Sequence, residues 1–147
     1  MHIMLTTYRE FKMPQQLLLF CYICVAVDMD AERFSEVIRS ARRFYENNQI
    51  RGLLMYDGRY FLHYITGARD NILRAQARLE TTVNAYDWEV LYMDKVAEFP
   101  AEYPIWQLGY ITSDDDQSHI EELRNAKGDL ARLTDIFSGF HQLEDIH

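Results

Sequence analysis

Two apolar stretches, IRGLLMY (50–56) and YFLHYIT (60–66), are separated by the three residues Asp-Gly-Arg (57–59). Both stretches are rich in aromatic and branched side chains, which favour strands. The Asp-Gly pair supplies the positive φ that a tight hairpin turn needs. The sequence therefore predicts two adjacent antiparallel strands at its centre. This hairpin restricts the fold more than any other feature, because every other element has to be placed around it.

Two amphipathic segments flank the hairpin and predict helices. The first runs from about 31 to 47 after a capping aspartate, Asp30, and its apolar residues fall on one stripe: Phe34, Val37, Ile38, Ala41 and Phe44. The second runs from about 71 to 84 after Asp70, which we expect to cap it, and its inward-facing residues are Ile72, Ala75, Leu79 and Val83.

Three further segments complete a sheet. LLLFCYICVAV (17–27) and DWEVLYMDKV (87–96) predict strands, and IWQLGYI (105–111) predicts a short fifth strand after a loop with two prolines. The order is β-α-β-β-α-β followed by one more strand. It predicts an α+β, ferredoxin-like fold in which a mixed sheet carries two helices on one face.

The residues after the fifth strand predict a pair of helices. SDDDQ (113–117) offers capping residues, Gly128 interrupts the helical pattern, and a second amphipathic stretch follows with Leu130, Leu133, Ile136, Phe137 and Phe140. The pair either covers the sheet face that the first two helices leave open or binds a partner, and the sequence leaves both interpretations open. The acidic residues here favour a basic partner, or they form helix caps and a solvated face.

Length and charge limit the class of protein. A chain of 147 residues can form one domain with a real core, and its net charge of −8 argues against a nucleic-acid partner. No apolar run reaches the length of a membrane span, and residues 1–16 lack the apolar core of a signal peptide, so we expect a cytoplasmic protein. We divide the chain into an N-terminal extension (1–16), a domain (17–112) and a helical tail (113–147).

Cys21 and Cys24 form a C-x-x-C pair within the predicted first strand. Redox pairs with this spacing usually open a helix, whereas residues three apart on a strand point to opposite faces. No second C-x-x-C or histidine pair supplies further metal ligands. We therefore interpret the two cysteines as small buried side chains and expect no metal site.

His63 lies in the middle of the apolar third strand, and strand alternation places it on one face with Phe61 and Ile65. A titratable side chain in this position is either a satisfied core histidine or part of a site.

Three separated blocks resemble the BLUF family of small flavin-binding sensors of blue light. FCYICVA (20–26) resembles the family's first strand, GLLMYDGRYFLHYITG (52–67) resembles its central hairpin, and YPIWQLGY (103–110) resembles its tryptophan-containing strand. The resemblance covers residues 17–111 and extends to the helical tail. It implies a bound FAD and a sensory function that acts through protein contacts and not through turnover.

The resemblance also implies where a flavin lies, edge-on between the two helices. The positions that it implies for cofactor binding are Tyr22, Cys24, Ile38, Tyr45, His63, Arg78, Trp106 and Leu108. Arg42 and Arg74 join Arg78 as candidates for the ribityl-phosphate end, although arginines on helices are usually solvated.

Cys24 stands at a serine of the family pattern and Leu108 at a methionine, and two further positions depart from the pattern in ways that matter more for the flavin. His63 stands at a glutamine that bridges the tyrosine and the flavin, and Tyr45 stands at an asparagine that bonds the flavin. A neutral imidazole offers one donor and one acceptor, so we expect His63 to accept from Tyr22 and donate to a flavin, or to take the tyrosine proton as a base. It cannot perform the amide switch of the glutamine. Tyr45, with Phe44, either fills the flavin slot or stacks on the ring.

Three hypotheses follow. The chain is a sensor that binds flavin with altered photochemistry, a flavin-free interaction module, or an enzyme that uses Tyr22 and His63. The last is the weakest, because the sequence offers no oxyanion donor or metal ligand beside the pair. For the first two we expect a downstream regulatory protein as partner and a homo-oligomer. The predicted contact surface is Trp106, Leu108, Leu130, Leu133, Phe137 and Phe140.

Overall fold

The computed structural model describes residues 16–26, 30–82, 85–100, 102–111 and 116–143. Its elements are β1 (Leu17–Ala26), α2 (Ala31–Asn47), β2 (Arg51–Tyr56), β3 (Tyr60–Ala68), α3 (Arg69–Thr82), β4 (Ala85–Val96), β5 (Trp106–Tyr110), α4 (Asp116–Asn125) and α5 (Leu130–Leu143). This order confirms the predicted β-α-β-β-α-β arrangement with a fifth strand and a helical pair. The predicted N-terminal extension up to residue 15, the residues 113–115, Val27 and Val83 lie outside the described residues.

The strands form one mixed sheet in the order β4-β1-β3-β2-β5. The predicted hairpin of β2 and β3 lies at its centre, and β3 also pairs antiparallel with β1. β4 pairs antiparallel with β1 at one edge, whereas β5 pairs parallel with β2 at the other. Sheet order thus places β1 and β3 side by side, which is what brings their central residues together.

Local chemistry sets the helix boundaries. The Asp30 side chain accepts a hydrogen bond from the backbone N–H of Arg33 at 2.7 Å, which confirms the predicted cap of α2. The predicted cap at Asp70 is wrong, because α3 begins at Arg69 and Asp70 lies within its first turn. A carboxylate there still favours the helix by its interaction with the helix dipole.

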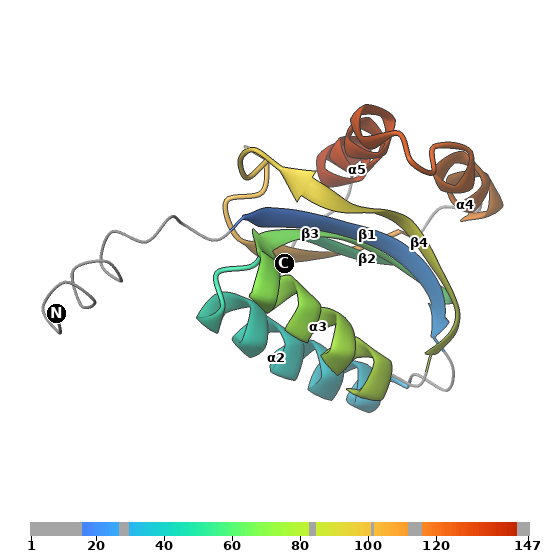
Figure 1. Ribbon diagram of the computed structural model, residues 1–147. Helices are drawn as coiled ribbons and strands as arrows, with labels where there is room; N and C mark the ends of the chain where they lie inside the picture. Colours follow the sequence, from blue (N-terminus) through green and yellow to red (C-terminus); the bar gives the residue numbers. More distant parts are fainter. Residues whose placement is uncertain (1–15, 27–29, 83–84, 101, 112–115, 144–147) are drawn as a thin grey trace, which may run out of the picture.

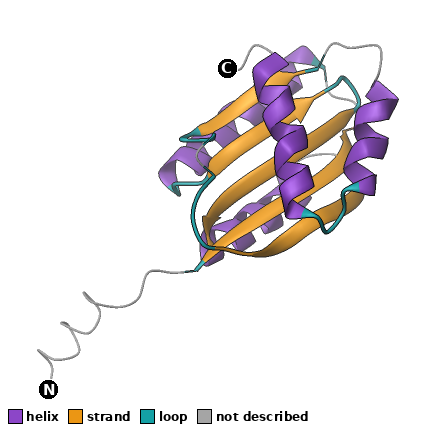
Figure 2. Ribbon diagram, turned by 90° about the horizontal axis from the view of Figure 1, so that it is seen from above, coloured by secondary structure: helices purple, strands orange, loops and turns teal. Residues whose placement is uncertain are grey.

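Two helical layers enclose the sheet. Figure 1 shows α2 and α3 on one side of the strands and α4 and α5 on the other. Figure 2, seen from above, shows helices in front of the sheet and behind it. One core, between the sheet and α2 and α3, holds Phe20, Tyr22, Phe34, Ile65 and Ile72 among others, and a second core lies on the α4–α5 face. We call these two sides the α2–α3 face and the α4–α5 face.

The helices α4 and α5 cover the second face of the sheet. This is the first of the two alternatives that the sequence left open for the tail. Leu133 and Phe137 are 0 % exposed against it. Trp106 and Leu108 lie on the opposite, α2–α3 face, where they are 1 % and 3 % exposed. The prediction of one partner-binding surface made from these residues is therefore wrong, because they are buried on two different sides of the sheet.

Cys21 and Cys24 are both free and buried, and they belong to the two opposite cores. Burial raises the pKa of the Cys21 thiol and raises the pKa of Cys24 to about 12, so both thiols stay protonated at neutral pH. No group of three metal-binding side chains occurs within the described part of the chain. These observations agree with two small buried side chains.

Candidate functional site

Tyr22 and His63 face each other from the two central strands. They are direct partners in the β1–β3 register, and both side chains lie on the α2–α3 face. The Tyr22 hydroxyl and the His63 Nδ1 atom are 2.8 Å apart, a hydrogen bond in a region where both residues are almost fully buried. The predicted adjacency of the two side chains is confirmed.

Trp106 holds the other side of the imidazole ring. Its indole Nε1–H donates to His63 Nε2 at 3.0 Å. An indole N–H can only donate, so Nε2 must accept, and the single proton of a neutral imidazole then resides on Nδ1. It follows that His63 Nδ1–H donates to the Tyr22 oxygen. The predicted direction, in which His63 accepts from Tyr22 and donates to a flavin, is therefore wrong.

The electrostatics of the site keep all its members neutral. Burial lowers the pKa of His63 from 6.5 to about 3, so the ring carries no charge at neutral pH. Burial and, secondarily, the nearby Tyr45 raise the pKa of Tyr22 well above its ordinary value. A base needs a free acceptor nitrogen, and in His63 the acceptor is occupied by Trp106. The pair is thus not arranged for proton transfer from Tyr22 to His63.

Tyr45 closes the aromatic cluster from α2. Its side chain is 1 % exposed, and its ring centre lies 5.5 Å from that of His63 and 4.9 Å from that of Trp106. Arg42, one turn earlier on α2, lies over the Trp106 ring at 5.2 Å. The space beside the imidazole is therefore occupied by side chains of this chain.

The structure brings most of the predicted positions together and separates one. In the core of the α2–α3 face lie Tyr22, Cys24, Ile38, Tyr45, Trp106 and Leu108, with His63 among them. Arg78 of α3 instead bonds Ser40 of α2 and lies over the Phe44 ring at 5.1 Å, so it joins the two helices at their outer side. Arg74 likewise donates to Asn48 Oδ1 at 2.7 Å.

Trp88 is the residue of this cluster that the sequence did not single out. It belongs to the edge strand β4, is 36 % exposed, and its ring centre lies 5.2 Å from that of Tyr22. Strand alternation along β4 gives Trp88 a face, but only the β4–β1 pairing shows that this face is the one that Tyr22 occupies.

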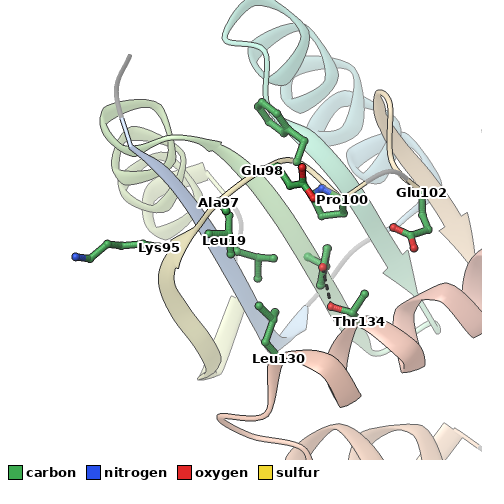
Figure 3. Close-up of a pocket in the computed structure, with 11 residues that line it drawn as sticks. Leu19, Lys95, Ala97, Glu98, Pro100, Glu102, Leu130 and Thr134 are labelled. Carbon is green, nitrogen blue, oxygen red and sulfur yellow. Dashed lines mark hydrogen bonds between the residues drawn. The ribbon is translucent and has the colours of Figure 1, made fainter. Parts of the chain in front are cut away.

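Tyr45 and Trp106 line a cavity of about 300 Å³, and Trp88 lines one of about 200 Å³. Two further cavities measure about 300 and 520 Å³, and neither Tyr22 nor His63 lines any of these four. The cavity of about 520 Å³ lies on the α4–α5 face, between α5 and the loop after β4 (Figure 3). Its wall includes Tyr64, whose hydroxyl bonds Thr134 Oγ1 at 2.9 Å. It is therefore separated from the Tyr22–His63 pair by the sheet itself.

The order of the elements and the buried Tyr22 on the first strand agree with the resemblance that the three sequence blocks carry. The family described as "BLUF: Sensors of blue-light using FAD" matches residues 17–109. The chain belongs to this family. Its members are sensory modules that bind a flavin, and in larger proteins they act with effector domains.

Solved structures agree in fold. The dark state of BlrB, a BLUF protein, superimposes with a TM-score of 0.66 at 16 % identity, over 86 % of this chain and 98 % of that one. The ground state of BlsA gives 0.64 at 16 % identity, over 84 % and 87 %. A bacterial light-regulated adenylyl cyclase gives 0.59 at 9 % identity, over 84 % of this chain and 36 % of that longer one. A search of curated proteins found no match.

Helices that could cross a membrane are absent from the described residues.

Proposed function

We propose that this chain is a BLUF-family signalling module that acts by contact with other proteins and does not hold a flavin in the family's manner. The observation that carries the proposal is the bonding of His63. Both of its ring nitrogens are used, one by Tyr22 and the other by Trp106. A site that exchanged hydrogen bonds with a flavin would need at least one of them.

The fit to a flavin also fails at Tyr45. The family's asparagine offers both an amide donor and an acceptor, whereas a tyrosine hydroxyl at this position has different reach and geometry. The buried Tyr45 ring packs against His63 and Trp106 and fills space between the helix and the sheet. The residues present therefore do not fit the flavin as the resemblance implied, and we derive no photochemical step from them.

An enzyme built on Tyr22 and His63 has less support. A general base works best with a pKa near the operating pH, and burial lowers that of His63 to about 3. The tyrosine in turn has a raised pKa and an accepting oxygen. Such a pair stabilises a core and does not activate a nucleophile.

Flavin retention is the direct test. After incubation with FAD and gel filtration, we expect the unmodified protein to elute colourless and to show no reversible red shift on illumination. We expect the double variant His63→Gln, Tyr45→Asn to retain FAD, because it restores amides at both positions. Visible absorption of the protein peak measures both results.

The matched control is Trp106→Phe, which frees His63 Nε2 but restores no amide. It should stay colourless. An unmodified protein that retains FAD in a one-to-one ratio and shows the full red shift would disprove the proposal.

The exposed apolar side of β4 supports a contact surface. Trp88 and Val90 lie on the α2–α3 face of this edge strand, where Val90 is opposite Tyr22 in the register and the Trp88 ring lies against the Tyr22 ring, and they are 36 % and 42 % exposed. We call them the β4 patch. The register between β1 and β4 shifts twice, and such irregularity at an edge disfavours simple strand addition. A contact through the side chains of the patch is therefore the better proposal, and a second copy of this chain offers an equally apolar surface.

Light scattering over a concentration series tests this contact. We expect a monomer–dimer transition that Trp88→Lys moves to at least tenfold higher concentration, since a buried aromatic residue commonly contributes about 2 kcal/mol at such centres. Ile105→Lys is the matched control, because Ile105 is 58 % exposed at the other edge of the sheet. A protein that is monomeric at all concentrations, or equal effects of the two variants, would rule out a dimer through the β4 patch.

A further inference from the structure

The cavity on the α4–α5 face has the walls of a binding site for a short apolar segment. Its volume of about 520 Å³ falls in the range that bound ligands occupy, roughly 300 to 1,000 Å³. Most of its lining is apolar: Leu19, Val96, Ala97, Phe99, Pro100 and Leu130. The hydroxyls of Tyr64 and Thr134 bond each other at its wall, so this part of the lining needs no polar partner (Figure 3).

The charge around this cavity is negative. Glu98 and Glu102 line it, are exposed, and form no ion pair with any residue that the structure describes. Glu102 lies close enough to contribute, after burial, to the raised pKa of Tyr64. The one lysine of the lining, Lys95, points away from the other lining residues (Figure 3). A basic and apolar occupant suits these surroundings.

The chain enters the sheet beside this cavity. Leu17, the first residue of β1, lies opposite Val96 of β4, and Leu19 lies opposite Asp94. Val96 and Leu19 both line the cavity. The residues that precede Gln16 therefore join the described structure at its border.

The residues before Gln16 include a segment that is both apolar and basic, as the cavity requires of its occupant. LTTYREFKM (5–13) carries the apolar residues Leu5, Tyr8, Phe11 and Met13. Its two basic residues, Arg9 and Lys12, outnumber its one acidic residue, Glu10, so the segment has a net charge of +1. The six residue steps from 11 to 17 can span up to about 20 Å, which is ample for a cavity next to the attachment point.

We propose that residues 5–13 of this chain dock in the cavity, with Phe11 in its apolar part and with Arg9 and Lys12 toward Glu98 and Glu102. A tether this short gives an effective concentration of about 1 mM or more, so that even weak contacts fill the site. Exposed ion pairs add little free energy, so burial of Phe11 drives the docking and the charges select its direction. The inference is independent of the proposed function.

Disulfide trapping in the full chain tests the docking. We expect the pair Glu10→Cys, Pro100→Cys, which keeps Phe11, to form an intramolecular disulfide under mild oxidation about tenfold faster than Glu10→Cys, Leu73→Cys, because docking raises the local concentration of the first pair. Leu73 is 39 % exposed on α3, whose first N–H bonds Gln16, so it is also within reach of the segment but lies on the other side of the sheet. The native cysteines are buried and do not compete.

Charge exchange sharpens the test. Adding Glu98→Lys and Glu102→Lys should slow trapping several-fold, and adding Arg9→Glu and Lys12→Glu to that variant should restore the rate. Equal trapping to positions 100 and 73, or rates insensitive to these charges, would overturn the proposal. A disulfide that forms between chains and depends on concentration would also overturn it, since the occupant would then be a second copy.

Discussion

Replacing Gly52 by alanine is expected to prevent folding or to lower the free energy of unfolding by about 4 kcal/mol or more, which is at the extreme of single substitutions. Gly52 adopts a φ of +149°, where side chains are strained, and an added Cβ would lie 2.0 Å from the backbone oxygen of Tyr64. That oxygen belongs to the central strand β3, which cannot move without disturbing both neighbours. Urea unfolding followed by circular dichroism measures the effect.

Gly139→Ala provides the matched control. Gly139 lies in α5, and its added Cβ meets no atom within 4 Å. Alanine is a better helix former than glycine, so this variant should gain about 0.5 to 1 kcal/mol. A Gly52→Ala protein with unfolding free energy close to that of the original would contradict the described register of β2 on β3.

Acid is expected to destabilise the protein through His63. The folded pKa of about 3 lies below the ordinary value of 6.5, so the unfolded chain binds a proton more readily than the folded one. The stabilising contribution is thus complete above pH 6.5 and is lost as the pH falls toward 3, by roughly 1 kcal/mol for each pH unit. Protonation would also place an N–H at Nε2, directly against the N–H of Trp106. Urea unfolding at pH 7, 6, 5 and 4 measures the loss.

Carboxylates titrate in the same range, so the comparison with His63→Gln isolates the histidine. Tyr22 and Tyr45, which face the ring, have raised pKa values and do not titrate there. The variant should lose clearly less stability than the original protein between pH 6.5 and 4. Parallel losses in the two proteins would show that His63 is already accessible to protons in the folded state.

Most of the fold could be predicted from the sequence, because its signals are local. The Asp-Gly turn gave the central hairpin, strand alternation gave the shared face of Phe61, His63 and Ile65, and Asp30 gave the start of α2. The errors were equally local: α3 begins one residue before its expected cap, and β4 begins at Ala85, two residues earlier than predicted.

The site could be predicted less completely, because its bonding depends on strand order. The expected topology was enough to predict that Tyr22 and His63 lie side by side on neighbouring strands. The bond from Trp106 did not, since it joins residues 43 positions apart and spans from the edge strand β5 over β2 to β3. That single contact reverses the expected direction of the Tyr22–His63 bond. The surface prediction failed for a related reason, because periodicity identifies an apolar face but not which side of the sheet receives it.

The same Trp106 bond changes how β5 should come apart. A five-residue strand at the edge of a sheet, paired only with β2, would ordinarily fray first and exchange its amide hydrogens rapidly. Here the strand is fastened at its first residue to a side chain two strands away. Local opening of β5 must therefore break the bond between Trp106 and His63 and disturb the buried aromatic cluster. The edge strand and the centre of the sheet should consequently unfold as one cooperative unit. The slow-exchanging part of this molecule should extend to its edge.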